Sequence, residues 1–198
     1  MNDSVSDAAR DEDQAQCVEA DRGHFNVLAR VLHWGMAAAI FAMLFMGVGM
    51  TTSLTWRPVL LDLHQPLGLA ILLLVVVRLA NRLRHGAPAL PPETPRLQAL
   101  AATASHWMLY GLMVLLPLIG WGMRSAGGWP VRMIQGWNLP PIAPTDPTLY
   151  ALLRDAHSIL AWLLFAVVIA HLSAALLHGW IYRDGVFSSM ARGPARSA

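Results

Sequence analysis

The stretch HSILAWLLFAVVIAHLSAALLHGW, residues 157–180, sets the architecture of this chain. Its length and apolar character are typical of a helix that crosses a bilayer, for which about 20 residues suffice. Two histidines, His157 and His171, lie 14 residues apart in it. On an α-helix that spacing is about 21 Å of rise, and it brings the second side chain to within about 40° of the first. Both imidazoles therefore project from nearly the same face at two depths of the membrane, which indicates a functional site.

Three more segments are apolar enough to cross a membrane. Charged residues make up 13% of the sequence, whereas a soluble domain typically has roughly 25%. Residues 31–56 and 97–123 contain no charged residue. A further apolar segment includes only Arg78, whose side chain can snorkel to the headgroups near a helix end. The sequence therefore predicts an all-α fold, an integral membrane four-helix bundle. The expected spans are residues 31–50, 63–80, 102–121 and 156–180.

Both ends of the chain are expected to lie outside this membrane domain, which covers residues 23–190. Residues 1–22 are polar and rich in Asp and Glu, which predicts a disordered cytoplasmic tail rather than a signal peptide. Residues 191–198 form a second predicted cytoplasmic tail. The single cysteine, Cys17, excludes a disulfide within the chain and a zinc or iron–sulfur centre built on cysteine clusters. Nothing in the sequence indicates a basic, aromatic-rich surface for nucleic acid.

The distribution of arginine predicts the orientation in the membrane, because cytoplasmic loops carry the excess of basic residues. All 14 basic residues are Arg. One side of the membrane holds both termini and the loop between the second and third spans. The arginines near the spans on that side are Arg22, Arg30, Arg78, Arg82, Arg84, Arg96, Arg183, Arg192 and Arg196, and those on the other side are Arg57, Arg124, Arg132 and Arg154. We therefore expect both termini in the cytoplasm.

This topology sorts the histidines into two layers. His64 opens the second span and His157 opens the fourth, both on the outer side. His171 lies in an inner layer, where His33 of the first span and His106 of the third span both qualify by depth as its partner. A pair of histidines from facing helices is a common way to hold a redox haem in a bundle. The spacing therefore predicts two haems held between helices and leaves the inner partner open.

Two other interpretations of these residues remain at this point. A single histidine in a membrane helix is often no more than a hydrogen-bonding residue between helices. A chain of histidines also occurs in proton or metal-ion pathways of transporters. Similarly, Arg78 has a plain interpretation as a snorkelling anchor at the inner headgroups.

A resemblance to a known family comes from short segments in a fixed order. They are Arg30-Val31-Leu32-His33-Trp34, His64-Gln65-Pro66-Leu67-Gly68, Val77-Arg78-Leu79, His106-Trp107-Met108-Leu109-Tyr110, Leu116-Pro117-Leu118-Ile119-Gly120, then His157, His171, His178 and Arg183-Asp184-Gly185. With these segments the chain resembles the bacterial cytochrome b561 family over about residues 24–190. This is a four-helix, di-haem, quinone-linked group that includes superoxide oxidase. It is related to the cytochrome b subunits of nickel–iron hydrogenases and formate dehydrogenases.

The resemblance implies the ligands of two haem b groups. His33 and His171 would hold the iron of the cytoplasmic haem, and His64 and His157 that of the periplasmic haem. His106 then becomes a non-ligand beside the inner haem, where it could contact quinone or help proton uptake. The resemblance thus favours His33 over His106 as the partner of His171. Depth in the membrane alone does not distinguish the two.

The function that the resemblance implies is single-electron transfer across the bacterial inner membrane. The favoured reaction is that of a superoxide:quinone oxidoreductase, in which a periplasmic donor, superoxide, is oxidised to oxygen and membrane ubiquinone is reduced. Arg124, Arg132 and Arg154 lie on the outer side near His157, where their positive charge could draw in a small anion. These three arginines could equally bind haem propionates or lipid headgroups.

Two alternatives describe other classes of protein. In the first, the chain is a cytochrome b anchor subunit that passes electrons from a partner dehydrogenase or hydrogenase to quinone. In the second, it is a haem-free transporter or assembly protein. The first differs from the favoured function in its donor, a redox partner protein instead of superoxide.

Overall fold

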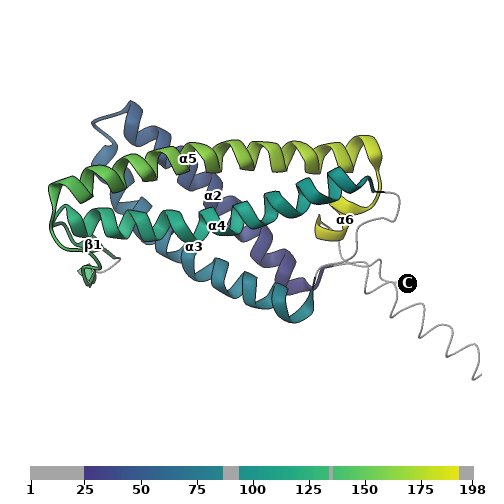
Figure 1. Cartoon of the computed structure of the whole chain (residues 1–198), viewed down its shortest axis with the longest axis horizontal. Coiled ribbons are helices and arrows are strands. Elements are labelled where there is room, and N and C mark those ends of the chain that lie inside the picture. The colour runs from purple at the N-terminus through teal and green to yellow at the C-terminus, as the bar shows by residue number, and fades with distance from the viewer. Residues whose placement is uncertain (1–24, 87–93, 134–135, 192–198) are drawn as a thin grey trace, which may run out of the picture.

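Figure 1 shows the computed structural model of the protein, which describes residues 25–86, 94–133 and 136–191. The expected tail over residues 1–22 lies outside the described residues, as does nearly all of the tail over residues 191–198. Four long helices dominate the described part. They are α2 (Val27–Thr52), α3 (Arg57–His85), α4 (Arg96–Ala126) and α5 (Pro147–Leu176), with α5 continuing into the π-helical turn η2 (Leu177–Tyr182) and then the short helix α6 (Val186–Ala191).

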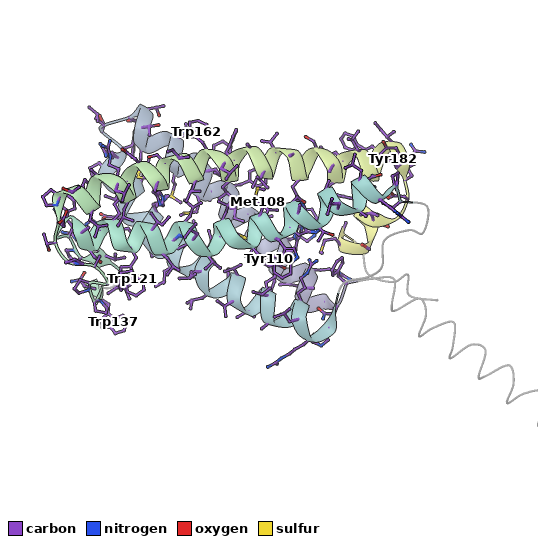
Figure 2. All side chains as sticks on the ribbon, viewed as in Figure 1. Met108, Tyr110, Trp121, Trp137, Trp162 and Tyr182 are labelled. Atoms are coloured by element: carbon purple, nitrogen blue, oxygen red, sulfur yellow. The ribbon has the colours of Figure 1, made fainter. Side chains whose placement is uncertain are left out.

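Each of the four long helices could cross a membrane. They are 26, 29, 31 and, for α5 together with η2, 36 residues long, and each contains a strongly apolar window. Most residues of these windows are not buried inside the bundle, so their apolar side chains are available to lipid. Trp162, for example, lies on the outer face of α5 (Figure 2). The predicted all-α membrane four-helix bundle is confirmed.

Two boundaries differ from the sequence-based expectation. Residues 81–84 were expected in a loop, but α3 continues to His85. In this last turn, Asn81 is buried and pairs with Asn26, and the guanidinium of Arg82 lies 5.8 Å from the Tyr110 ring centroid. These contacts with α2 and α4 extend the helix beyond its membrane-spanning part.

The fourth helix also begins earlier than expected, at Pro147 rather than near residue 156. Asp146 caps it, because its side-chain oxygen accepts a hydrogen bond from the Leu149 backbone N–H at 2.8 Å. Proline is favoured at the first helical position, where its missing N–H has no partner to lose. Arg154 therefore lies within a helix and not in a connection.

The helices pack as two antiparallel pairs. α2 packs along α3 and α4 along α5, and a smaller α3–α4 interface joins the pairs. The buried core runs between these helices and includes Met36 and Ile40 of α2, Ile71 and Val75 of α3, Tyr110, Leu112, Met113 and Leu116 of α4, and Leu164 of α5. Within the described residues the backbone of α5 stays further from α2 and α3 than from α4.

The two ends of the bundle differ. At one end, which we call the hairpin end, the strands β1 (Val131–Arg132) and β2 (Asn138–Leu139) form a small antiparallel hairpin between α4 and α5. Trp121 and Trp137 lie at this end and Tyr182 at the opposite end (Figure 2).

The opposite end, which we call the termini end, holds the first residue of α2 and the helix α6 (Figure 1). Here α6 folds back onto α2: the Phe25 backbone N–H donates to Ser189 O, and Trp34 Nε1 donates to Met190 O, both at 3.3 Å.

Candidate functional site

Two histidines from different helices face each other near the hairpin end. His64 comes from α3 and His157 from α5, and their ring centroids are 6.3 Å apart with an interplanar angle of 64°. Within the described residues, the Nδ1 atoms of both rings are buried and have no side-chain hydrogen-bond partner, and the backbone carbonyl of Leu116 lies beside the His157 ring. The His157 ring packs against Gly120 of α4, where an added Cβ would lie 3.4 Å from His157 Cε1. A larger residue than glycine would therefore push on this ring.

A second pair lies near the termini end. His33 of α2 and His171 of α5 have ring centroids 6.3 Å apart and an interplanar angle of 62°. His106 of α4 is also close to His171, with centroids 5.4 Å apart and an interplanar angle of 68°. Both residues that share a predicted depth with His171 thus lie beside it, at different separations.

The spacing of each pair can be compared with that of two imidazoles bound to one metal ion. A metal–imidazole nitrogen bond is about 2 Å long, and bond lengths within the ring place each nitrogen about 1.1 Å from the centroid. Two imidazoles on opposite sides of one ion would then have centroids about 6.2 Å apart. The pairs His64–His157 and His33–His171 match this value. His106 and His171 are closer together than two imidazoles on opposite sides of one ion would be.

Arg78 of α3, for which a snorkelling anchor at the inner headgroups was the plain interpretation, contacts His33. Its Nη1 donates to the Ala29 backbone oxygen at 3.0 Å, and its Nη2 lies 3.1 Å from His33 Nδ1. Because arginine has only donors, His33 Nδ1 is the acceptor. The guanidinium thus joins two groups of α2, and its charge sits beside the imidazole.

His178 is engaged by neighbours of its own. Its Nδ1 lies 2.5 Å from Asp184 Oδ2, and its Nε2 lies 2.9 Å from Gln98 Nε2. The residue is in η2, two turns beyond His171. These contacts fit the expectation that His178 does not complete the inner pair.

The three arginines predicted for anion capture lie in different settings. Arg124 donates from Nη2 to Pro130 O at 3.2 Å, and its guanidinium lies 5.3 Å from the Trp129 ring centroid, so it holds the connection after α4. Arg132 lines a hollow of about 460 Å³ together with Asp62, Met133, Gly136 and Asn138. Arg154 is exposed on α5, three residues before His157.

The hairpin is tied to the helix that carries His64. The Arg132 backbone N–H donates to Gln65 Oε1 at 3.2 Å, and Gln65 Nε2 donates to Leu61 O at 3.2 Å. Trp121 Nε1 of α4 donates to Pro140 O at 2.9 Å. The residues after α4 therefore form a fixed cover over the hairpin end.

Two contacts of the site were not predicted. Gly120 was noticed only as part of a segment, and nothing in its position along the chain indicates that it touches His157. Arg78 could have been found, because it lies 14 residues after His64, the same spacing that separates His157 from His171. That spacing puts the guanidinium about 21 Å from His64 along α3, at the depth of the second pair.

The fold and the two imidazole pairs are those expected of one class of protein, a membrane cytochrome built on a four-helix bundle. Comparison with known proteins agrees: the model of the family described as prokaryotic cytochrome b561 matches residues 24–193. The chain belongs to this family.

Two of the similar proteins are named as cytochrome b561 homologs and a third as a probable superoxide oxidase. The chain is 27% identical to cytochrome b561 homolog 2 of Escherichia coli (strain K12) over 170 residues, 84% of this chain and 90% of the relative. It is 29% identical to cytochrome b561 homolog 1 of the same organism over 129 residues, 65% of this chain and 73% of the relative. It is 28% identical to a probable superoxide oxidase CybB of Yersinia pestis over 138 residues, 69% of this chain and 77% of that protein.

Family membership makes the protein an integral membrane cytochrome that binds haem b and transfers electrons. The residues present fit such a group. Among the described residues, no three or more His, Cys, Asp or Glu converge to hold a metal ion by themselves. Two facing imidazoles suit instead a metal that brings its other ligands with it, as iron in a porphyrin does. The haem-free transporter alternative is therefore set aside.

Proposed function

We propose that the protein transfers single electrons between a periplasmic donor, favoured as superoxide, and ubiquinone in the bacterial inner membrane. The observation that carries this proposal is the presence of two imidazole pairs of equal spacing at the two ends of one bundle, with α5 contributing to both. A protein that only binds one redox group needs one such pair. Two pairs at different depths provide a route across the membrane.

In this proposal each of two haem b groups is held by one pair. His64 and His157 hold one at the hairpin end, and His33 and His171 hold the other at the termini end. Bound haem b supplies one-electron redox chemistry, and two imidazoles on its iron leave no position for oxygen. The bundle residues keep each imidazole aimed at its partner, and the many apolar side chains around them exclude water.

The arginine distribution supports a periplasmic position for the hairpin end. There the exposed Arg154, one turn before His157, would attract a small anion to the donor side. Arg132 is a weaker candidate, because Asp62 lines the same hollow. Arg124 is the weakest, since its guanidinium already binds the connection.

At the termini end, His106 is the candidate for the quinone or its protons. It lies beside His171, closer than two imidazoles on opposite sides of one iron would be, and we assign its imidazole to hydrogen bonds with another group. The overall reaction needs such a group, because two superoxide anions each lose one electron and leave as oxygen, while one ubiquinone takes up two electrons and two protons. Imidazole is well suited to carry those protons.

The decisive experiment is stopped-flow mixing of the purified, oxidised, haem-loaded protein with superoxide and a soluble ubiquinone analogue. We expect haem reduction at a rate near the diffusion limit and one quinol formed per two superoxide anions. A rate no higher than that of an unrelated haem protein with two histidine ligands would contradict the superoxide reaction. If a dehydrogenase or iron–sulfur protein co-purifies and is required for reduction, the anchor-subunit alternative is correct.

The proposed role of Arg154 has a matched control at the same end. Arg57 is likewise exposed and opens α3. We expect Arg154→Gln to lower the rate of reduction by superoxide and to weaken its dependence on salt, since exposed charges act over about 10 Å at 0.1 M ionic strength. Arg57→Gln should have a smaller effect. Equal effects would mean that only the total charge of this end matters.

A further inference from the structure

The contact between Arg78 and His33 is held in place by a second link between the same two helices. Arg78 donates to Ala29 O and to His33 Nδ1, at 3.0 and 3.1 Å. One turn further along α3, the side-chain amides of Asn81 and Asn26 exchange two hydrogen bonds, both 3.3 Å long. The guanidinium is therefore positioned by two acceptors on α2 and by a neighbouring link that fixes α2 against α3.

The pair at the hairpin end has no comparable neighbour. Both His64 Nδ1 and His157 Nδ1 are buried, and within the described part of the chain neither has a charged hydrogen-bond partner; the polar group beside the His157 ring is the neutral backbone carbonyl of Leu116. The residue that packs on the His157 ring is Gly120, which brings no charge. Two imidazole pairs of equal spacing thus differ in one respect that matters for electron transfer: one has a cation against a ligand ring.

We propose that Arg78 is a positioning residue for His33 and makes the haem of the termini end easier to reduce than the haem of the hairpin end. This inference rests on the proposed function, because it assumes that His33 and His171 hold one of two haems. Arginine stays protonated in proteins, and a charge acts more strongly in a partly buried setting than in water. A cation beside a ligand stabilises the reduced form, which carries one more electron. Hydrogen bonds and charges around a ligand are known means of tuning a metal site.

The effect does not depend on the hydrogen bond alone. A neutral ring that binds iron through Nε2 carries its proton on Nδ1, which then cannot accept a hydrogen bond from Arg78. A guanidinium that stays within a few ångströms of the ring still acts on the haem through its charge. The difference in potential sets the direction of electron transfer, so electrons that enter at the hairpin end move toward the termini end. A purely structural role, in which Arg78 only joins α3 to α2, would alter stability without altering the difference between the two haems.

The test is a potentiometric titration of the purified two-haem protein, followed by haem absorbance, for the wild type, Arg78→Gln, Arg78→Lys and Arg82→Gln. Arg82→Gln is the matched control, because Arg82 lies one turn further along α3 and contacts the Tyr110 ring. We expect Arg78→Gln to shift one of the two midpoint potentials downward and to leave the other in place. Arg78→Lys should shift the same component less, since a lysine keeps the charge but cannot span both acceptors. Arg82→Gln should shift it least.

The component that moves can be assigned in single-haem backgrounds. With His64→Ala, the remaining haem should shift downward when Arg78→Gln is added. With His33→Ala, the remaining haem should not shift. If Arg78→Gln loses a haem, the lysine variant carries the test, and an unchanged potential there contradicts the proposal. An upward shift, an equal shift of both haems, or an equal shift from Arg82→Gln also contradicts it.

The haem count separates this inference from the function on which it rests. A wild-type protein with one haem by pyridine haemochrome, or a His33→Ala variant that keeps two, would overturn the pairing itself. If the wild type has two haems and each histidine variant loses one, but the midpoint potentials do not change in the Arg78 variants, only the role of Arg78 is overturned.

Discussion

The pair His33–His171 and the pair His64–His157 have the same spacing and nearly the same interplanar angle, yet their surroundings differ. The termini-end pair has a guanidinium on one ring and a third histidine beside the other. Within the described residues, the hairpin-end pair has buried Nδ1 atoms without a charged partner and a glycine against one ring. The bundle thus repeats the spacing of two facing imidazoles and varies their neighbours, and under the proposed function these neighbours would set what each site does.

Of the substitutions considered, removing a histidine from α5 should have the largest effect, the loss of a whole haem. We expect His157→Ala to lose the haem of the hairpin end and His171→Ala to lose that of the termini end, so that each variant keeps one of two haems. The double variant should keep none, because α5 supplies a ligand to both sites. Pyridine haemochrome quantification of the purified proteins measures the result.

His106→Ala tests whether His33, rather than His106, is the partner of His171. Its ring lies closer to His171 than two imidazoles on opposite sides of one haem iron would, so this variant should keep both haems. Loss of one haem here, together with retention of both in His33→Ala, would mean that the termini-end pair has been assigned to the wrong helix.

A bulky residue at Gly120 should weaken the hairpin-end site alone. Gly120→Val adds atoms against the His157 ring, and overpacking of this kind costs about 1–3 kcal/mol. Because about 1.4 kcal/mol is a factor of ten in an equilibrium constant, haem at this site should bind about 5- to 150-fold more weakly. Haem retention during dilution measures the change.

Gly111→Val on the same helix is the control for Gly120→Val, since an added Cβ there meets nothing within 4 Å. It should keep both haems. A loss of haem that is the same in the two variants would show that helix α4 tolerates no valine, rather than that Gly120 makes room for a ligand.

Substitutions of the helix caps at the two ends should have a smaller effect, a loss of thermal stability that differs between the two caps. Asn26 caps α2 and also pairs with the buried Asn81, whereas Asp146 only caps α5. Loss of a cap costs about 1 kcal/mol, and leaving a buried amide such as Asn81 without its partner costs about 1–3 kcal/mol more. Thermal unfolding of the haem-loaded protein should therefore show a larger destabilisation for Asn26→Ala than for Asp146→Ala. The reverse order would remove the argument that the Asn26–Asn81 link fixes α2 against α3.

The sequence predicted the number of helices and the pairing of depths well, because uncharged windows and a spacing of 14 residues are local properties of the chain. Helix boundaries were harder. Residues 81–84 precede a proline-rich segment, and only contacts with Asn26 and Tyr110 keep them helical. The early start of α5 was readable from Asp146 and Pro147, a cap followed by a favoured first residue.

Other parts of the site depend on packing between helices. Depth could not choose between His33 and His106, because both lie level with His171. Their separations from His171, 6.3 and 5.4 Å, depend on how α2 and α4 approach α5. The same holds for the contact of Gly120 with His157, which requires knowing which face of α4 meets α5.

The sharing of α5 by both pairs fixes the length of the electron path. His157 and His171 are separated along one continuous helix, and a helix is much stiffer along its axis than the packing between helices. Because both histidines lie on this helix, a movement of α2 and α3 relative to α5 would leave the separation of about 21 Å between the two levels unchanged. Under the proposed function, α5 would therefore set the distance between the two redox centres, and with it the rate of electron transfer between them.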